Sequence, residues 1–222
     1  MASTVTPEQV SVGVLVTAVP RDALSAAAVA CGVVDRRAGG KLPVHVTAYL
    51  TMAMCLFPDD DYTEVATKVT GSLDRFGCWD AAWSPPTAGG ITQARKRLGR
   101  RVLAEVFEGV AQPVAAAGSR GSWLRGRRLL AIDGFDVDLP DTPENATEFG
   151  YAGSKDTRSA FPKARVVTLS ECGTHAFLAA EVAPWNTAEK TLANRLYQRL
   201  CPDELLTADR LFYSFTVAVQ LG

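Results

Sequence analysis

The sequence has few side chains of the kind that bind zinc or form disulfide frameworks. Its 222 residues include only two histidines, and its five cysteines are widely spaced without a C-x-x-C pair. Zinc sites and disulfide frameworks both need Cys or His at short, recurring spacings. We therefore expect neither, and we predict reduced, mostly buried thiols of the kind found in cytosolic proteins.

Long apolar runs are also missing. The first ten residues lack a basic segment followed by an apolar core and a cleavage site, and no apolar run reaches the roughly 18 residues of a membrane helix. We therefore expect a cytoplasmic protein that makes no membrane contact. With 47% hydrophobic and 21% charged residues, the composition is that of an ordinary globular chain and excludes collagen-like and low-complexity proteins.

The net charge of −1 hides an uneven distribution of charged residues. Residues 1–90 carry 6 basic and 9 acidic side chains, residues 91–130 carry 9 and 2, and residues 131–222 carry 8 and 13. A strongly basic segment between two acidic ones is available to contact a polyanion. The charge pattern therefore suggests a nucleic-acid partner for the middle of the chain.

The first 122 residues have the pattern of a helical domain. Segments of helical period, bounded by Pro or Gly, predict helices over residues 9–18, 22–30, 42–57, 62–71 and 91–117. The acidic run 59–61 precedes one of these helices and is expected to cap it, because a helix N-terminus stabilises negative charge. Residues 78–90 and 118–126 are rich in Pro, Gly or Ser and predict connections.

The helix predicted over 91–117 has two distinct faces. Apolar residues at spacings of three and four form one stripe: Ile91, Ala94, Leu98, Val102 and Val106. Basic residues occupy the rest of the circumference: Arg95, Lys96, Arg97, Arg100 and Arg101. Two interpretations of the basic face remain, a solvated surface or a helix that binds nucleic-acid phosphates and releases their counterions.

From residue 128 the pattern changes to strands. Apolar runs predict strands over residues 129–132, 164–169, 174–182 and 205–208, with 171–173 as a hairpin turn. The first of these runs ends at Asp133, and beyond it Phe135, Val137 and Leu139 alternate with acids in a strand pattern up to Pro140. Helices are predicted over 187–200, with Asn186 as N-cap, and over 211–221. Near residue 142, Thr142 and Asn145 are expected to shape a turn. The second half of the chain is therefore expected to be an α/β domain.

Two carboxylates stand out by their position. Asp133 and Asp209 each follow four residues of a predicted buried strand, and ligand sites of α/β sheets lie at strand ends. Either residue alone is also consistent with a cap or turn. If the strands are neighbours, the two carboxylates lie side by side and favour a cation, such as Mg²⁺, that also binds substrate phosphates. Other nearby acids, Asp136, Asp138 and Asp141, are expected to be solvated.

Around these aspartates the sequence resembles a known family. The run from Leu130, Leu-Ala-Ile-Asp-Gly-Phe-Asp-Val-Asp-Leu-Pro, resembles the first-aspartate motif of insertion element 4 type transposases. The run from Leu205, Leu-Leu-Thr-Ala-Asp-Arg-Leu-Phe-Tyr, resembles their second-aspartate motif. Three upstream segments are similar to the helical N-terminal domain of the same family: 42–58, 62–65 and 91–99.

The resemblance implies a fold and an activity. It implies a helical N-terminal domain over 1–122 and a ribonuclease-H-like α/β catalytic core with a mixed sheet over 123–222. Its chemistry would be Asp-Asp-Glu strand cleavage and strand transfer with Mg²⁺ or Mn²⁺, in which Asp133 and Asp209 are the catalytic metal ligands. The implied partners are the terminal inverted repeats of the element, target DNA, and a second copy of the chain or a full-length transposase.

One motif of that family is missing from the sequence. The third carboxylate belongs to a Tyr-x2-Arg-x3-Glu-x6-Lys motif, which does not occur here. We therefore expect the catalytic core to be incomplete at its C-terminus and the chain to be at best weakly active as a nuclease. Two functions remain: an insertion-sequence transposase that lacks the third carboxylate, or a non-catalytic DNA-binding or inhibitory remnant of one.

Overall fold

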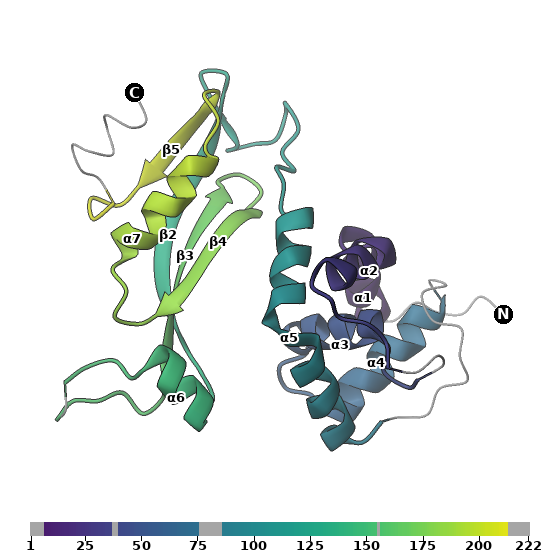
Figure 1. The fold of residues 1–222 in the computed structure, drawn as a ribbon. Helices are drawn as coiled ribbons and strands as arrows, with labels where there is room; N and C mark the ends of the chain where they lie inside the picture. Colours follow the sequence, from purple (N-terminus) through teal and green to yellow (C-terminus); the bar gives the residue numbers. More distant parts are fainter. Residues whose placement is uncertain (1–6, 37–39, 76–85, 155, 213–222) are drawn as a thin grey trace. The chain divides into compact units, whose positions relative to one another are not determined.

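The computed structural model describes residues 7–36, 40–75, 86–154 and 156–212 (Figure 1). The chain divides into two compact units, Met1–Val110 and Ala111–Gly222. A helical first part is followed by a mixed sheet with helices, as predicted. The division lies before the predicted boundary at residue 122, because the long helix that was expected to reach residue 117 ends at Val110.

Five helices make up the described part of the first unit: α1 (Pro7–Ala18), α2 (Arg21–Ala30), α3 (Val44–Leu56), α4 (Tyr62–Arg75) and α5 (Ala88–Val110). All five were predicted, with shifts at their ends. The largest shift is at the end of α5, at Val110 instead of residue 117, and the start of α5 includes the last three residues of the connection predicted over 78–90. Most of that connection, residues 76–85, lies outside the described residues.

Helix α3 lies in the core of the helical unit. Val46, Tyr49 and Leu50 are fully buried, and the phenol of Tyr49 donates a hydrogen bond of 2.6 Å to the carbonyl of Val19. The five apolar residues of the predicted α5 stripe are all buried, which confirms that prediction. The helical period of the sequence thus correctly identified the inward face of α5.

The N-terminus of α4 is capped by Asp61. Its Oδ1 accepts hydrogen bonds from the N–H groups of Thr63, at 2.7 Å, and Glu64, at 2.8 Å. In return the Glu64 carboxylate accepts from the N–H of Asp61 at 3.0 Å. This reciprocal pair is a capping box. The predicted cap is therefore confirmed at Asp61, whereas Asp60 pairs with Lys68.

Replacement of Asp61 by alanine is expected to lower the free energy of unfolding by about 1 kcal/mol, because two N–H groups of α4 lose their acceptor. Urea denaturation followed by circular dichroism measures the change. The control is Asp59→Ala, which removes an exposed carboxylate from the same acidic run. Equal losses in the two variants would show that general charge near the helix, rather than the cap, stabilises α4.

The second unit contains a five-stranded mixed sheet. Its strands are β1 (Trp123–Leu124), β2 (Arg127–Asp138), β3 (Lys163–Glu171), β4 (Phe177–Pro184) and β5 (Glu204–Ala208). Strand β2 pairs in antiparallel fashion with β1 and β3 and in parallel with β5, while β4 pairs in antiparallel fashion with β3. Helices α6 (Pro143–Phe149) and α7 (Glu189–Leu196) complete the unit, with a 3₁₀ turn at Tyr197–Arg199.

Several sequence predictions for this unit were wrong in detail. Strand β2 does not end at Asp133 but continues to Asp138, because β3 pairs with it over this whole length. Helix α6 was not predicted; Thr142 is its N-cap and accepts from the N–H of Asn145 at 3.3 Å. The N-cap of α7 is Ala188 rather than Asn186. Most of the helix predicted over 211–221 lies outside the described residues.

Helix α7 covers one face of the sheet (Figure 1). Leu130 and Ile132 of β2 point to this face and pack in one apolar cluster with Leu192 and Leu196 of α7. Because side chains alternate along a strand, Ala131 and Asp133, each adjacent to Ile132, belong to the opposite face. Packing by α7 therefore determines which face of β2 is available to a ligand.

Two further expectations concern cysteines and membrane spans. In the described part of the chain, Cys31, Cys55, Cys172 and Cys201 are free thiols. Cys55 and Cys201 are exposed and the other two are half-buried, so the prediction of mostly buried thiols was wrong for these four. Within the same ranges, no single helix is both long and apolar enough to cross a bilayer. The segments Ser11–Ala18 and Arg21–Ala30 meet that criterion only as a pair, across a bend of 54°.

Candidate functional site

Asp133 and Asp209 lie in neighbouring register positions. The parallel pairing of β2 with β5 runs from Arg128 opposite Glu204 to Ile132 opposite Ala208. Asp133 is the next residue of β2, and Asp209 is the residue that follows β5. Because the two strands are parallel and adjacent, both carboxylates belong to the same end of β5. The strands that carry the two aspartates are therefore neighbours, which is the arrangement that would place the carboxylates side by side.

Both carboxylates are exposed, and each accepts one hydrogen bond from a nearby backbone N–H group. One oxygen of Asp133 accepts from the N–H of Gly134 at 2.8 Å, and one oxygen of Asp209 accepts from the N–H of Leu211 at 2.7 Å. Neither aspartate forms an ion pair with a basic side chain that the structure describes. A second oxygen of each carboxylate is thus left for a ligand. No group of three or more His, Cys, Asp or Glu that could hold a metal occurs among the described residues.

The neighbouring acids of β2, Asp136 and Asp138, are exposed, as expected, and each also pairs with a basic residue of β3. Arg165 of β3 binds Asp136 through Nε at 2.9 Å, and Lys163 binds Asp138 at 2.5 Å. The hydrogen bond to Asp136 raises the pKa of the Arg165 guanidinium. These pairs form because Asp136 and Asp138 are register partners of Arg165 and Lys163. Asp136 and Asp138 are thus held by ion pairs within the sheet, whereas Asp133 has no ion pair with a described residue.

Asp141 is also occupied within the protein. It lies after β2 and accepts a hydrogen bond of 2.5 Å from the phenol of Tyr151. This hydrogen bond raises the pKa of the Tyr151 hydroxyl. Asp141 therefore shapes the α6 connection and is not available as a ligand of the Asp133 and Asp209 site.

One further acid near Asp133 was not noticed in the sequence. Glu189, in the first turn of α7, lies directly over Gly134: a Cβ at this glycine would come within 2.9 Å of the Glu189 carboxyl carbon. Its Oε1 is 3.9 Å from Nε of Arg165. Glycine within an apolar strand was the available signal for such a close approach. Glu189 belongs to the α7 face, so it is not on the same face as Asp133.

The other end of β2 carries a buried ion pair. Glu171 is fully buried at the end of β3, where it pairs with Arg128 and accepts from Thr174 and from the N–H of Ala115 at 2.9 Å. Burial raises the pKa of the Glu171 carboxyl, but the hydrogen bonds and the charge of Arg128 lower it more. The net pKa lies below its ordinary value, so this carboxylate stays charged.

The five basic residues of α5 do not form one uniform face. Gly99, with φ of 69°, interrupts the helix between Arg97 and Arg100. Arg95 is half-buried and donates a hydrogen bond of 2.9 Å to the phenol of Tyr62, over whose ring it also stacks. Lys96, Arg97, Arg100 and Arg101 are exposed. Arg95 thus has a packing role in the helical unit, and the exposed cations remain candidates for phosphate contacts.

Comparison with known proteins identifies the helical unit. Residues 9–108 match the family model described as insertion element 4 transposase N-terminal. The helical unit belongs to this transposase family. The match covers α1 to α5 almost completely, including the basic helix and its apolar stripe. The resemblance found in the sequence is therefore confirmed for this part of the chain.

Two relatives extend the similarity into the sheet unit. The candidate transposase InsZ of Escherichia coli strain K12 is 31% identical over 160 residues, which cover 72% of this chain and 54% of InsZ. The transposase InsG for insertion sequence element IS4, from the same organism, is 28% identical over 174 residues, which cover 78% of this chain and 38% of InsG. The chain thus spans about half or less of the length of these relatives. No solved structure gives a match.

Proposed function

We propose that this chain acts in DNA transposition, as the N-terminal and first catalytic part of an insertion-sequence transposase. The proposal rests mainly on the adjacent positions of Asp133 and Asp209 on β2 and β5. Its fold supports a ribonuclease-H-like core: β2, β3 and β4 form an antiparallel meander, and the chain returns through α7 to β5, which lies parallel to β2. The family of the helical unit supports the same function.

The residues present fit a hard divalent cation, Mg²⁺ or Mn²⁺. Such ions are commonly bound by one or two carboxylates, with water and substrate phosphates as the remaining ligands. When bound between Asp133 and Asp209, the ion would supply activation of water and charge stabilisation for strand cleavage and strand transfer at element ends. The protein contributes orientation, because the N–H groups of Gly134 and Leu211 each fix one carboxylate oxygen.

The helical unit is proposed to bind the DNA substrate, which comprises the terminal inverted repeats and the target. Exposed cations of α5, such as Lys96, Arg97 and Arg101, would contact phosphates and supply a salt-dependent affinity. Arg95 would act indirectly, by fixing α5 against Tyr62 of α4. Association with a second copy or with a full-length transposase stays a prediction.

A test of the metal site measures Mn²⁺ binding by electron paramagnetic resonance. Asp133→Asn and Asp209→Asn are each expected to weaken binding at least tenfold, because each removes one of two carboxylate ligands. Asp203→Asn is the matched control, since Asp203 is an exposed acid in the turn before β5. Equal Mn²⁺ binding by wild type, Asp133→Asn and Asp209→Asn would contradict the site.

One observation favours a second function, that of a non-catalytic or inhibitory DNA-binding protein. The exposed cations Lys96, Arg97 and Arg101 belong to the helical unit, so DNA binding through them does not depend on Asp133 or Asp209. This function predicts salt-dependent binding to duplex DNA that persists in an Asp133→Ala/Asp209→Ala variant, with no DNA cleavage in Mg²⁺. Cleavage that is lost in Asp133→Ala would instead establish the catalytic function.

A further inference from the structure

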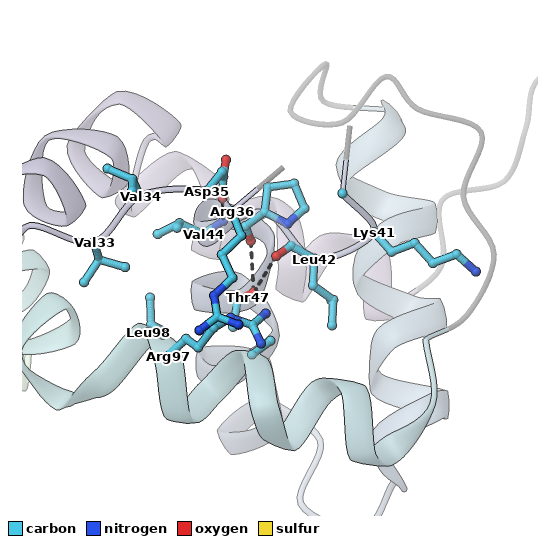
Figure 2. Close-up of a pocket in the computed structure, with 13 residues that line it drawn as sticks. Val33, Val34, Asp35, Arg36, Lys41, Leu42, Val44, Thr47, Arg97 and Leu98 are labelled. Carbon is cyan, nitrogen blue, oxygen red and sulfur yellow. Dashed lines mark hydrogen bonds between the residues drawn. The ribbon is translucent and has the colours of Figure 1, made fainter. Parts of the chain in front are cut away.

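The helical unit contains a cationic pocket of about 320 Å³ between α5 and the segment that leads into α3 (Figure 2). Its walls come from residues 33–36, 40–44 and 47, and from Ala94, Arg97 and Leu98 of α5. We infer that this pocket binds a phosphate group of the DNA backbone. The inference rests on the proposed DNA-binding function and assigns it a specific site.

The charges of the pocket favour an anion. Three cationic side chains line it, those of Arg36, Lys41 and Arg97, against a single acid, Asp35. The Asp35 carboxylate already accepts a hydrogen bond of 2.7 Å from the N–H of Val44, the first residue of α3. Asp35 therefore caps a helix, and the lining retains an excess of positive charge.

Arg36 and Arg97 provide the groups that recognise phosphate. They come from different segments of the chain, and Figure 2 shows both guanidinium groups directed to the same part of the pocket, while Lys41 extends away from them. Both arginines are exposed, and neither pairs with another residue that the structure describes. Two like charges in one pocket repel each other unless an anion lies between them. Guanidinium groups bind phosphate oxygens in bidentate geometry, which suits this arrangement.

The surroundings favour a phosphodiester chain over a single free anion. Lys96 precedes Arg97 on α5, is exposed, and has no partner among the described side chains. One free phosphate would satisfy the pocket but leave Lys96 unpaired. A nucleic-acid backbone places successive phosphates along such a surface, so that the pocket holds one and Lys96 contacts the next.

The test is fluorescence anisotropy of the full chain with a labelled DNA duplex over a salt series. The slope of log affinity against log salt counts the phosphates contacted, not the arginines. Because Arg36 and Arg97 share one phosphate, an Arg36→Gln/Arg97→Gln variant is expected to reduce the slope by about 1 and the affinity by about eightfold at 100 mM salt. Each single variant is expected to lose no more than this.

Arg21→Gln is the matched control, because Arg21 is an exposed arginine on α2 outside the pocket. Thermal melts verify that all variants fold. A slope reduced by about 2 in the double variant would indicate two separate phosphates and overturn the shared pocket. A double variant indistinguishable from Arg21→Gln would overturn the pocket while DNA binding stands. Failure of wild type to bind duplex at low salt would overturn both the pocket and the DNA-binding function.

A free-phosphate ligand is distinguished by a second measurement. The melting temperature is recorded in inorganic phosphate and in chloride at equal ionic strength. The DNA assignment predicts a reduced duplex slope in the double variant, whether or not phosphate also stabilises the wild type. Phosphate stabilisation that depends on Arg36 and Arg97, together with an unchanged duplex slope, would overturn the DNA assignment in favour of a free anion.

Discussion

Replacement of Arg128 by methionine is expected to destabilise the sheet unit by about 3–5 kcal/mol at pH 7. The Glu171 side chain is fully buried, whereas that of Arg128 keeps 17% exposure. Loss of the arginine therefore leaves a negative charge that cannot reach water, which costs far more than the loss of a surface ion pair. Methionine keeps an apolar side chain of similar length but also removes the guanidinium that lies 4.7 Å from the centroid of the Trp123 ring. Urea denaturation of the purified chain measures the difference.

The neighbouring residue supplies the control for this variant. Arg127 is exposed on the same strand, and Arg127→Met is expected to change the free energy of unfolding by less than about 0.5 kcal/mol. Similar losses in both variants would show that the buried pair has no special role and that the β2 N-terminus merely requires basic residues.

The stabilisation that the Arg128–Glu171 pair provides is expected to decrease as the pH falls. The folded-state pKa of Glu171 lies below the ordinary 4.5, so its stabilising contribution is present above pH 4.5 and is lost as pH falls through the folded pKa. Removal of Arg128 raises the folded-state pKa of Glu171, so the stability difference between wild type and Arg128→Met should narrow as the pH falls from this raised pKa to the lowered pKa in wild type, because a protonated Glu171 no longer needs a cation. A difference that stays constant with pH would contradict a charged Glu171.

Substitution of Gly173 by alanine is expected to lower the free energy of unfolding by about 2–3 kcal/mol, through steric overlap. Gly173 lies in the turn between β3 and β4, against the segment that precedes β1. A Cβ there would meet the side chain of Ser122, and it would come within 2.5 Å of the carbonyl oxygen of Arg120 and 2.6 Å of the Ser122 nitrogen. Two of these atoms belong to the backbone, so a rotamer change cannot relieve the overlap.

Gly118→Ala provides the comparison. An added Cβ at Gly118 has nothing within 4 Å, so this variant is expected to be neutral or slightly stabilising. Thermal denaturation of both variants measures the difference. Gly173→Ala with wild-type stability would show that the turn and the segment 120–122 move apart easily, and that their close packing contributes little.

Local patterns in the sequence correctly predicted the five helices of the first unit and the short strand β5. The stripe of Ile91, Leu98 and Val106 is buried as its spacing indicated, because a helix places residues three and four apart on one face. Leu205 to Ala208 form a strand that ends at Asp209, as predicted. The capping role of Asp61 was also visible, since acids before a helical run satisfy its free N–H groups.

Interactions between distant segments were the source of the wrong predictions. The ion pairs of Asp136 and Asp138 were not predicted, because their partners, Arg165 and Lys163, lie on β3 and become neighbours only through strand register. The same pairing extended β2 beyond Asp133. The break in α5 at Gly99, where φ is 69°, was also missed, because a single glycine is tolerated inside a helix and does not by itself predict a break.

In the two candidate sites too, local sequence identified the residues, whereas tertiary structure placed them together. Residue type and position singled out Asp133 and Asp209, because carboxylates after buried strands are recognisable in any sequence. Parallel pairing of β2 with β5 brought them to adjacent positions, since register depends on contacts between residues more than seventy apart in the chain. Likewise, local charge indicated a basic α5, but the approach of Arg36 to Arg97 follows from how the loop before α3 packs on α5. Helical periodicity, helix capping and local charge depend on residues close together in the sequence. The geometry of each site depends on packing between distant segments, which fixes the register of β5 against β2 and the position of the loop before α3 against α5.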